Sequence, residues 1–334
     1  MTTIYIAQPQ TELKIQSRQL QVFHQQQFCF AVPIHHINQL VILGQQPWTR
    51  KAANLALSLH IPVLYFEPDG RCVEYLSSDS FKPAKYSTVQ RQRALRGAEL
   101  PRKAEFSRST TESLVRAKLH NARVLLLQLS HDPQPTTVQQ VLNLLQRLLD
   151  DLPMAPSLIA LKHHESTGSS FYRAALNKLL PYSFRYRNQG LNPIQRLTNL
   201  GTALLSQRIQ TILQTVGLDL DIANLHLDSI TRPPLVCDFL TEFQGSIVDR
   251  LVMDLLQSTQ IVPDDFIGFE QGIFLCPDAL ERFIQHWDTA LSTEVQHLYA
   301  GKISYHQCIE TQVDEYIACL LEDQDFYRPM LLKL

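Results

Sequence analysis

The sequence has few of the features that mark exported, membrane-bound or zinc-binding proteins. Its 334 residues include six cysteines without any C-x-x-C pair, and this scatter argues against a zinc cage or a disulfide framework. No run of about 18 apolar residues occurs, and no charged segment precedes an apolar run at the N-terminus. We therefore expect a cytoplasmic protein with no membrane partner, whose cysteines are buried apolar side chains.

The chain also lacks the net positive charge typical of nucleic-acid-binding domains, since its formal charge is −2. The charge is unevenly distributed, however, because the segment 81–130 contains eleven basic and three acidic residues. A solvated helix surface is one explanation of this basic segment, and contact with DNA phosphates is the other. The basic residues for which we predict DNA contacts are Arg91, Arg93, Lys118, Arg123, Arg173, Arg185 and Arg187.

Hydrophobic residues make up 45% of the chain, and their spacing changes near residue 80. Before it, short β-branched or aromatic runs predict strands at 3–6, 20–23, 28–32, 41–44 and 63–66. After it, helical spacing predicts helices at 138–149, 166–180, 197–216, 241–256, 277–298 and 305–321. A capping box formed by Ser109 and Glu112 predicts the start of another helix.

These patterns predict an α+β protein with a small β-rich domain followed by a larger, mainly α-helical domain. The expected limits are 1–80 for the N-terminal β-domain, 81–90 for a linker, and 91–334 for the helical domain. Most of the basic segment and the histidine and acids discussed below lie in this domain, so we predict that it is the catalytic and DNA-binding domain.

The segment 217–250 places a histidine close to two acids, because His226, Asp238 and Glu242 follow one another at steps of twelve and four residues. Residues four apart share one face of a helix, so the two carboxylates of a helix beginning at Asp238 would point the same way and could face His226. Such a set of nitrogen and oxygen donors suits Mg²⁺ or Mn²⁺. A hydrogen-bonded surface cluster without a metal is the alternative interpretation.

Several ordered blocks resemble one known protein family. They lie at 41–44, 61–70, 118–123, 192–205, 217–226, 235–251, 304–312 and 327–329. Together they are similar to the CRISPR-associated spacer integrase, the metal-dependent nuclease subunit of the CRISPR adaptation complex. The resemblance spans essentially the whole chain.

The resemblance implies a divalent-metal-dependent DNA endonuclease and integrase. Such an enzyme inserts short fragments of double-stranded DNA, the spacers, into a CRISPR repeat array when a 3′-hydroxyl attacks a phosphodiester. It also implies a homodimer formed through the N-terminal β-domain, and a small ferredoxin-like partner subunit. The cofactor would be Mg²⁺ or Mn²⁺.

The family further implies a third metal ligand, a Glu that opens a helix and precedes a Tyr by seven residues. Glu165 and Tyr172 have this spacing, whereas alignment on the aromatic pair would place His164 at the ligand position. The predicted catalytic and metal-binding residues are therefore Glu165, His226, Asp238 and Glu242. His226 acting as a general base is the alternative role for this imidazole.

Three positions depart from the family pattern. Thr241 stands where the family usually has an acid that binds metal, Ser166 replaces a usual Gly, and Gln195 replaces a common Asn. A neutral hydroxyl is a poor ligand for a hard cation, so Thr241 weakens the predicted site unless Glu242 or Asp238 compensates. Two other functions therefore remain open: a catalytically weakened DNA-binding scaffold subunit, and a metal-dependent nuclease acting on branched repair DNA.

Overall fold

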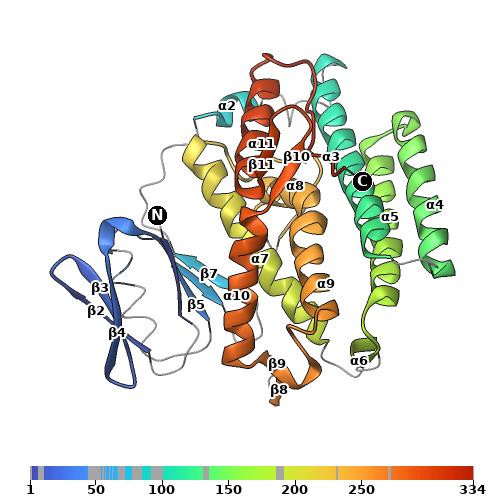
Figure 1. Cartoon of the computed structure of the whole chain (residues 1–334). Coiled ribbons are helices and arrows are strands. Elements are labelled where there is room, and N and C mark those ends of the chain that lie inside the picture. The colour runs from blue at the N-terminus through green and yellow to red at the C-terminus, as the bar shows by residue number, and fades with distance from the viewer. Residues whose placement is uncertain are drawn as a thin grey trace. The chain divides into compact units, whose positions relative to one another are not determined.

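The computed structural model describes residues 2–6, 11–43, 54, 56, 58–59, 61, 63–66, 72–76, 85–91, 101–130, 135–185, 192–230, 232–269 and 272–333. An N-terminal region rich in strands precedes a mostly helical region, which confirms the predicted fold class (Figure 1). Contacts divide the chain into two units. Met1–Phe81, Arg187–Ala203 and Gln260–Ile284 form the first unit, and Lys82–Tyr186, Leu204–Thr259 and Gln285–Leu334 form the second. The domain limits expected from the sequence stay a prediction.

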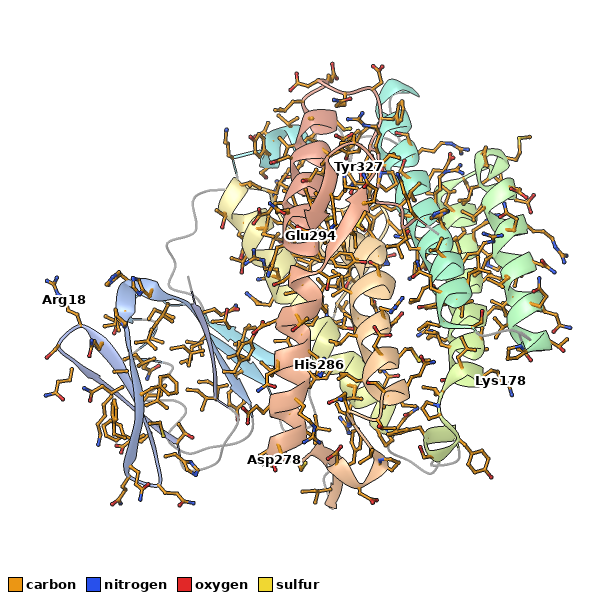
Figure 2. All side chains as sticks on the ribbon, viewed as in Figure 1. Arg18, Lys178, Asp278, His286, Glu294 and Tyr327 are labelled. Atoms are coloured by element: carbon orange, nitrogen blue, oxygen red, sulfur yellow. The ribbon has the colours of Figure 1, made fainter. Side chains whose placement is uncertain are left out.

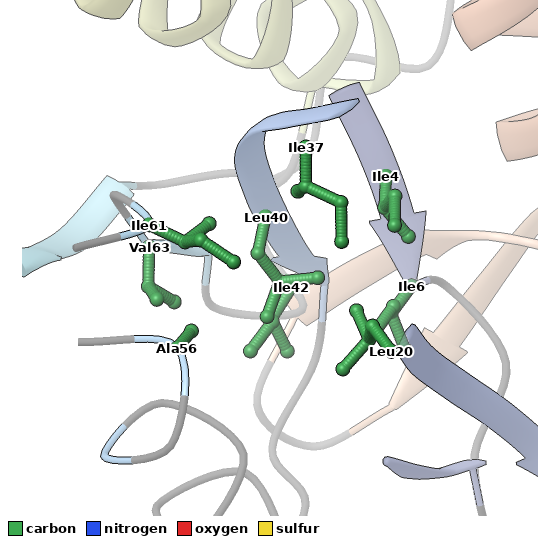
Figure 3. Close-up of a cluster of buried hydrophobic side chains, with 9 residues drawn as sticks. All are labelled: Ile4, Ile6, Leu20, Ile37, Leu40, Ile42, Ala56, Ile61 and Val63. Carbon is green, nitrogen blue, oxygen red and sulfur yellow. The ribbon is translucent and has the colours of Figure 1, made fainter. Parts of the chain in front are cut away.

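The first unit contains a mixed sheet and an antiparallel sheet. The mixed sheet has the order β1 (Thr2–Ile6), β5 (Ile37–Leu43), β6 (Val63–Phe66) and β7 (Cys72–Leu76), and only β7 is antiparallel to its neighbour. The antiparallel sheet consists of β2 (Thr11–Gln16), β3 (Gln19–His24) and β4 (Gln27–Pro33). Alternate residues of a strand point to the same face, so Ile4 and Ile6 join Leu40 and Ile42 in one buried cluster (Figure 3).

Helices dominate the rest of the chain. They are α2 (Ser87–Gln90), α3 (Pro101–Leu129), α4 (Thr136–Asp151), α5 (Leu158–Leu179), α6 (Tyr182–Arg185), α7 (Pro193–Val216), α8 (Pro234–Phe243), α9 (Arg250–Gln257), α10 (Pro277–Ser292) and α11 (Tyr305–Leu320). Two hairpins accompany them, β8 (Phe266–Phe269) with β9 (Gly272–Leu275), and β10 (Glu294–His297) with β11 (Gly301–Ser304). Within the second unit α3, α4 and α5 pack against one another (Figure 1).

Several helices begin earlier than the sequence predicts, and α3 and α5 do so by two turns. The prediction that Ser109 caps a helix is wrong, because α3 begins at Pro101 and the Ser109 hydroxyl donates to the Phe106 carbonyl of the preceding turn. The prediction that a helix starts at residue 166 is also wrong. Ser157 caps α5, since its hydroxyl oxygen accepts the Ala160 N–H at 3.2 Å.

The predicted helix 241–256 is divided into three parts. Between α8 and α9 the backbone forms a π-helical stretch, Gln244–Asp249, in which hydrogen bonds join residues five apart rather than four. The side chains after residue 243 therefore point in directions that α-helical periodicity does not predict. Among the described residues, no helix is long and apolar enough to cross a membrane.

The C-terminal segment, residues 327–333, is fixed to α3 and α8 by hydrogen bonds. Asn121 on α3 donates its amide to the Glu242 and Met330 carbonyls and accepts the Leu332 N–H at 2.8 Å. Tyr327 packs on Tyr316 of α11, and Figure 2 shows it beside that helix. A buried polar network thus connects the C-terminal segment to the core of the second unit.

Candidate metal and DNA site

Glu165 lies in the middle of α5 and forms an ion pair with Lys118 of α3. Gly168 explains why the two helices approach so closely, because a Cβ at this position would overlap the Leu119 side chain. Burial alone would raise the pKa of the Glu165 carboxyl, but the Lys118 ammonium, His226 and the Ser169 hydroxyl together lower it below its usual value. Glu165 is therefore an ionised carboxylate with a cation already beside it.

His226 is held by the carboxylate of Asp238, which is 1% exposed. The Asp238 oxygens accept the backbone N–H groups of Asn224, Leu225 and His226, so the loop before α8 wraps around this acid. Asp238 also accepts the His226 Nδ1 proton at 3.0 Å. Because Nδ1 carries the proton, the Nε2 atom of His226 has a lone pair available for a cation or a proton.

Glu242 points away from this arrangement, into the interior of the second unit. It is 0% exposed, and its carboxylate accepts the Tyr327 hydroxyl at 2.6 Å and the Met330 N–H. Burial raises the pKa of Glu242 to about 8, although these hydrogen bonds and Gln312 partly offset the effect. The structure thus makes Glu242 an anchor for the C-terminal segment, rather than a neighbour of Glu165 and His226.

Thr241 does not offer a replacement ligand. Its hydroxyl donates to the Cys237 carbonyl at 2.9 Å within α8, and the residue is 6% exposed. The sequence suggested that Asp238 or Glu242 could supply the negative charge that Thr241 lacks. In the structure both carboxylates already accept other hydrogen bonds. Their carboxylates position a histidine and a chain segment, respectively.

Asp249 lies near Lys118 and Arg173, and the sequence does not predict it there. It ends the π-helical stretch, and its carboxylate accepts the Tyr172 hydroxyl at 3.0 Å. Burial raises the pKa of Asp249 to about 6, with Tyr172, Lys118 and Arg173 opposing the rise. The segment 248–250 is one of the blocks that resemble the family, but the sequence did not indicate a role for its aspartate.

The donor atoms present fit a divalent cation only in part. Within the described part of the chain, no cluster of three His, Cys, Asp or Glu side chains is arranged to hold a metal ion. The Oε2 atom of Glu165 and the Nε2 atom of His226 have no protein partner among the described residues. Mg²⁺ commonly binds one or two protein ligands and completes its shell with water and substrate phosphates, so this pair of donors fits a cation of that kind.

The predicted DNA-binding residues fall into three groups. Arg91 is 67% exposed on its side chain and lies 3.8 Å from Asp219, and Arg173 is exposed on α5, two turns after Glu165. Lys118 is paired with Glu165, while Arg123 is partly buried and its Nε has no hydrogen-bond partner. Arg93, Arg187 and the side chain of Arg185 lie outside the described residues.

Comparisons with known proteins give consistent results. A family model for CRISPR associated protein Cas1 matches residues 4–289. CRISPR-associated endonuclease Cas1 3 of Thermus thermophilus is 24% identical over 306 residues, which are 90% of this chain and 88% of that protein. A Cas6-RT-Cas1–Cas2 complex has a chain of similar fold, with a TM-score of 0.81 and 20% identity over 100% of this chain and 36% of that chain. A casposase bound to its integration product has a TM-score of 0.77 and 16% identity over 97% of this chain and 92% of its own.

The chain thus shares its fold with a casposase and with Cas1 proteins, and its second unit brings a histidine and a carboxylate together. The family model covers most of the sequence, so this chain belongs to the Cas1 family of CRISPR-associated proteins. The resemblance found in the sequence is confirmed.

Proposed function

We propose that this chain is a metal-dependent DNA endonuclease and integrase, which inserts short double-stranded DNA fragments into a CRISPR repeat array. The observation that carries the proposal is the orientation of His226 by Asp238, which leaves Nε2 free near Glu165. Membership of a family whose curated relatives are named endonucleases, and a fold shared with a casposase solved on its integration product, support the same reaction.

The proposed reaction is the attack of a DNA 3′-hydroxyl on a phosphodiester of the repeat array. Mg²⁺ or Mn²⁺, held by Glu165 and His226, would supply positive charge next to the phosphate that reacts. Asp238 keeps the His226 ring in one tautomer and orientation. Lys118, which is paired with Glu165, and Arg173, which acts on Asp249, supply positive charge beside these two carboxylates.

The proposal includes partners. Double-stranded DNA, both spacer precursors and repeat array, is the substrate, and a homodimer with a small ferredoxin-like subunit is the proposed assembly. A solved relative in a Cas6-RT-Cas1–Cas2 complex supports a partner of the Cas2 kind. Salt-dependent contacts from exposed arginines would position the DNA backbone.

A catalytically weakened DNA-binding scaffold is the second candidate. Thr241 motivates it, since its hydroxyl is bonded to the Cys237 carbonyl and supplies no negative charge. A strand-transfer assay with purified protein, Mn²⁺, a repeat-array duplex and a fragment with a free 3′-hydroxyl separates the two candidates. Joined product that requires Glu165 supports the integrase, whereas DNA binding without any joining supports the scaffold.

Thr241→Asp is expected to tighten Mn²⁺ binding, on the order of tenfold, because the affinity of oxygen sites for hard cations rises with ligand charge. Position 241 is three residues after Asp238, so a new carboxylate would lie on the same helix face as the acid that holds His226. Calorimetric titration with Mn²⁺ measures the effect. Thr241→Asn is the neutral control, and equal affinities of the two variants would contradict the expectation.

Arg91→Gln combined with Arg173→Gln is expected to flatten the dependence of log K on log salt for duplex DNA. Each lost phosphate contact should lower the slope by roughly 0.9, because fewer counterions are released on binding. Fluorescence anisotropy at several salt concentrations provides the slope. Arg147→Gln, at an exposed position of α4 outside the basic segment, is the control, and an unchanged slope in the double variant would place both arginines away from DNA.

A further inference from the structure

Lys118 occupies one of the two carboxylate oxygens available for a metal ion. Its ammonium contacts Oε1 of Glu165, which also accepts the Ser169 hydroxyl at 3.2 Å. The Lys118 and Glu165 side chains are 29% and 15% exposed, so water screens this pair only in part. A cation supplied by the protein itself therefore stands beside the proposed metal ligand.

The position of Lys118 is fixed by the helix packing beneath it. The neighbouring residue Leu119 is 1% exposed and fills the space left by Gly168, three residues after Glu165 on α5. The backbone of Lys118 therefore cannot move away from Glu165 without disrupting a close contact between α3 and α5. Only the flexible side chain beyond the Cβ atom is able to reorient.

A second carboxylate lies within the electrostatic reach of the same ammonium. Lys118 opposes the rise in the pKa of Asp249, whose Oδ2 atom accepts the Tyr172 hydroxyl. Glu165 and Asp249 thus both attract the Lys118 side chain, although only Glu165 forms the ion pair. The Lys118 ammonium therefore has a second carboxylate nearby, Asp249, when Glu165 binds a metal ion.

We propose that Lys118 competes with the divalent cation for Glu165, and that bound DNA relieves this competition. The inference rests on the proposed function, because it takes Glu165 and His226 as the metal-binding pair. A divalent cation on Oε2 and an ammonium on Oε1 of the same carboxylate repel each other, so the cation binds Glu165 more tightly once the Lys118 side chain has turned away. A DNA phosphate at the site offers the ammonium a new anionic partner and adds an oxygen ligand for the cation.

The consequence is a positive coupling between metal binding and DNA binding. Linkage requires that DNA raises the affinity for the cation by the same factor by which the cation raises the affinity for DNA. Free protein would bind Mn²⁺ weakly, and the complete site would form only on its substrate. Lys118 is then a positioning residue that weakens metal binding in the absence of DNA.

The test compares Mn²⁺ binding by calorimetry in the full chain and in Lys118→Met, without DNA. The loss of the competing ammonium should tighten Mn²⁺ binding roughly twofold to fivefold, since an ion pair of this exposure contributes about that factor. Lys162→Met is the matched control. Lys162 lies three residues before Glu165 on α5 and pairs with Asp228, so a general effect of one lost positive charge would appear in this variant too.

A second set of titrations includes a short duplex DNA. Wild-type protein should bind Mn²⁺ more tightly with DNA than without it, and this gain should be smaller in Lys118→Met. Lys118→Gln repeats the comparison with a polar side chain, and thermal unfolding monitored by circular dichroism verifies that the variants are folded. Unchanged or weaker Mn²⁺ binding in folded Lys118→Met and Lys118→Gln would overturn the inference.

Glu165→Gln separates this inference from the proposed function. If Glu165→Gln loses Mn²⁺ binding while the Lys118 variants bind like wild type, the metal site stands and the competition by Lys118 is overturned. If Glu165→Gln binds Mn²⁺ like wild type, both with and without DNA, Glu165 is not a ligand and the proposed metal site fails as well. If the Lys118 variants bind Mn²⁺ more tightly than wild type, and this gain disappears when Glu165→Gln is combined with them, the result supports both the metal site and the competition by Lys118.

Discussion

His226→Ala is expected to abolish DNA joining in the presence of Mn²⁺, with a loss on the order of a thousandfold. The substitution removes the Nε2 atom that faces away from Asp238 and leaves Glu165 without its nitrogen partner. The fold should persist, because Asp238 keeps the backbone N–H groups of Asn224 and Leu225. Joining of a labelled fragment into a repeat-array duplex measures the loss, and thermal unfolding measures the integrity of the protein.

His163→Ala provides a matched control, since this exposed histidine lies on α5 two residues before Glu165. If His226→Ala joins DNA as fast as His163→Ala does, His226 has no role in the reaction. Mn²⁺ calorimetry distinguishes its two possible roles. A metal ligand predicts weaker Mn²⁺ binding in His226→Ala, whereas a general base predicts unchanged binding with a changed dependence of the joining rate on pH.

Local periodicity predicts the longer helices and the strands β1, β3, β4, β5 and β6, because the apolar spacing of each element reflects its own buried face. It does not predict β2 or the two hairpins, and the predicted helix 277–298 is wrong at its end, because α10 ends at Ser292 and β10 follows. The predicted helices at 138–149 and 305–321 correspond to α4 and α11 within three residues at each end. The predicted cap at Ser109 is wrong, because a Ser followed three residues later by a Glu also occurs inside helices. There the Ser hydroxyl donates to a backbone carbonyl of the preceding turn, as Ser109 does to Phe106. Nothing local to residue 109 reveals that α3 began eight residues earlier.

The site was harder to predict, because its acids find partners far away in the sequence. Asp238 and Glu242 are four residues apart on α8, yet their carboxylates serve different structures. Glu242 accepts hydrogen bonds from Tyr327 and Met330, which follow at least 85 residues later in the sequence. The spacing of residues along one helix cannot predict such a contact. Asp249 was missed for a related reason, since the π-helical stretch before it changes the direction of its side chain.

The buried carboxyl of Glu242 is expected to make the stability of the protein depend on pH. Burial raises the pKa of Glu242 from its usual 4.5 to about 8, so the folded protein holds a proton that the unfolded chain releases between these values. The folded state then binds more protons than the unfolded state, and the free energy of unfolding falls as pH rises from about 4.5 to about 8. One such group contributes a slope on the order of 1 kcal/mol per pH unit.

Glu242→Gln should remove this slope, because an amide is neutral at every pH and is able to accept the Met330 N–H and to donate to the Tyr327 oxygen. Urea unfolding of both proteins from pH 5 to pH 9 measures the difference in their free energies of unfolding. Asp249, whose pKa is raised to about 6, titrates in both proteins and cancels in this difference.

We expect the variant to gain stability relative to wild type as pH rises, and to retain wild-type Mn²⁺ binding because Glu242 faces the C-terminal segment. A difference that stays flat with pH would show that Glu242 is ionised in the folded protein, and a loss of Mn²⁺ binding would return it to the set of metal ligands.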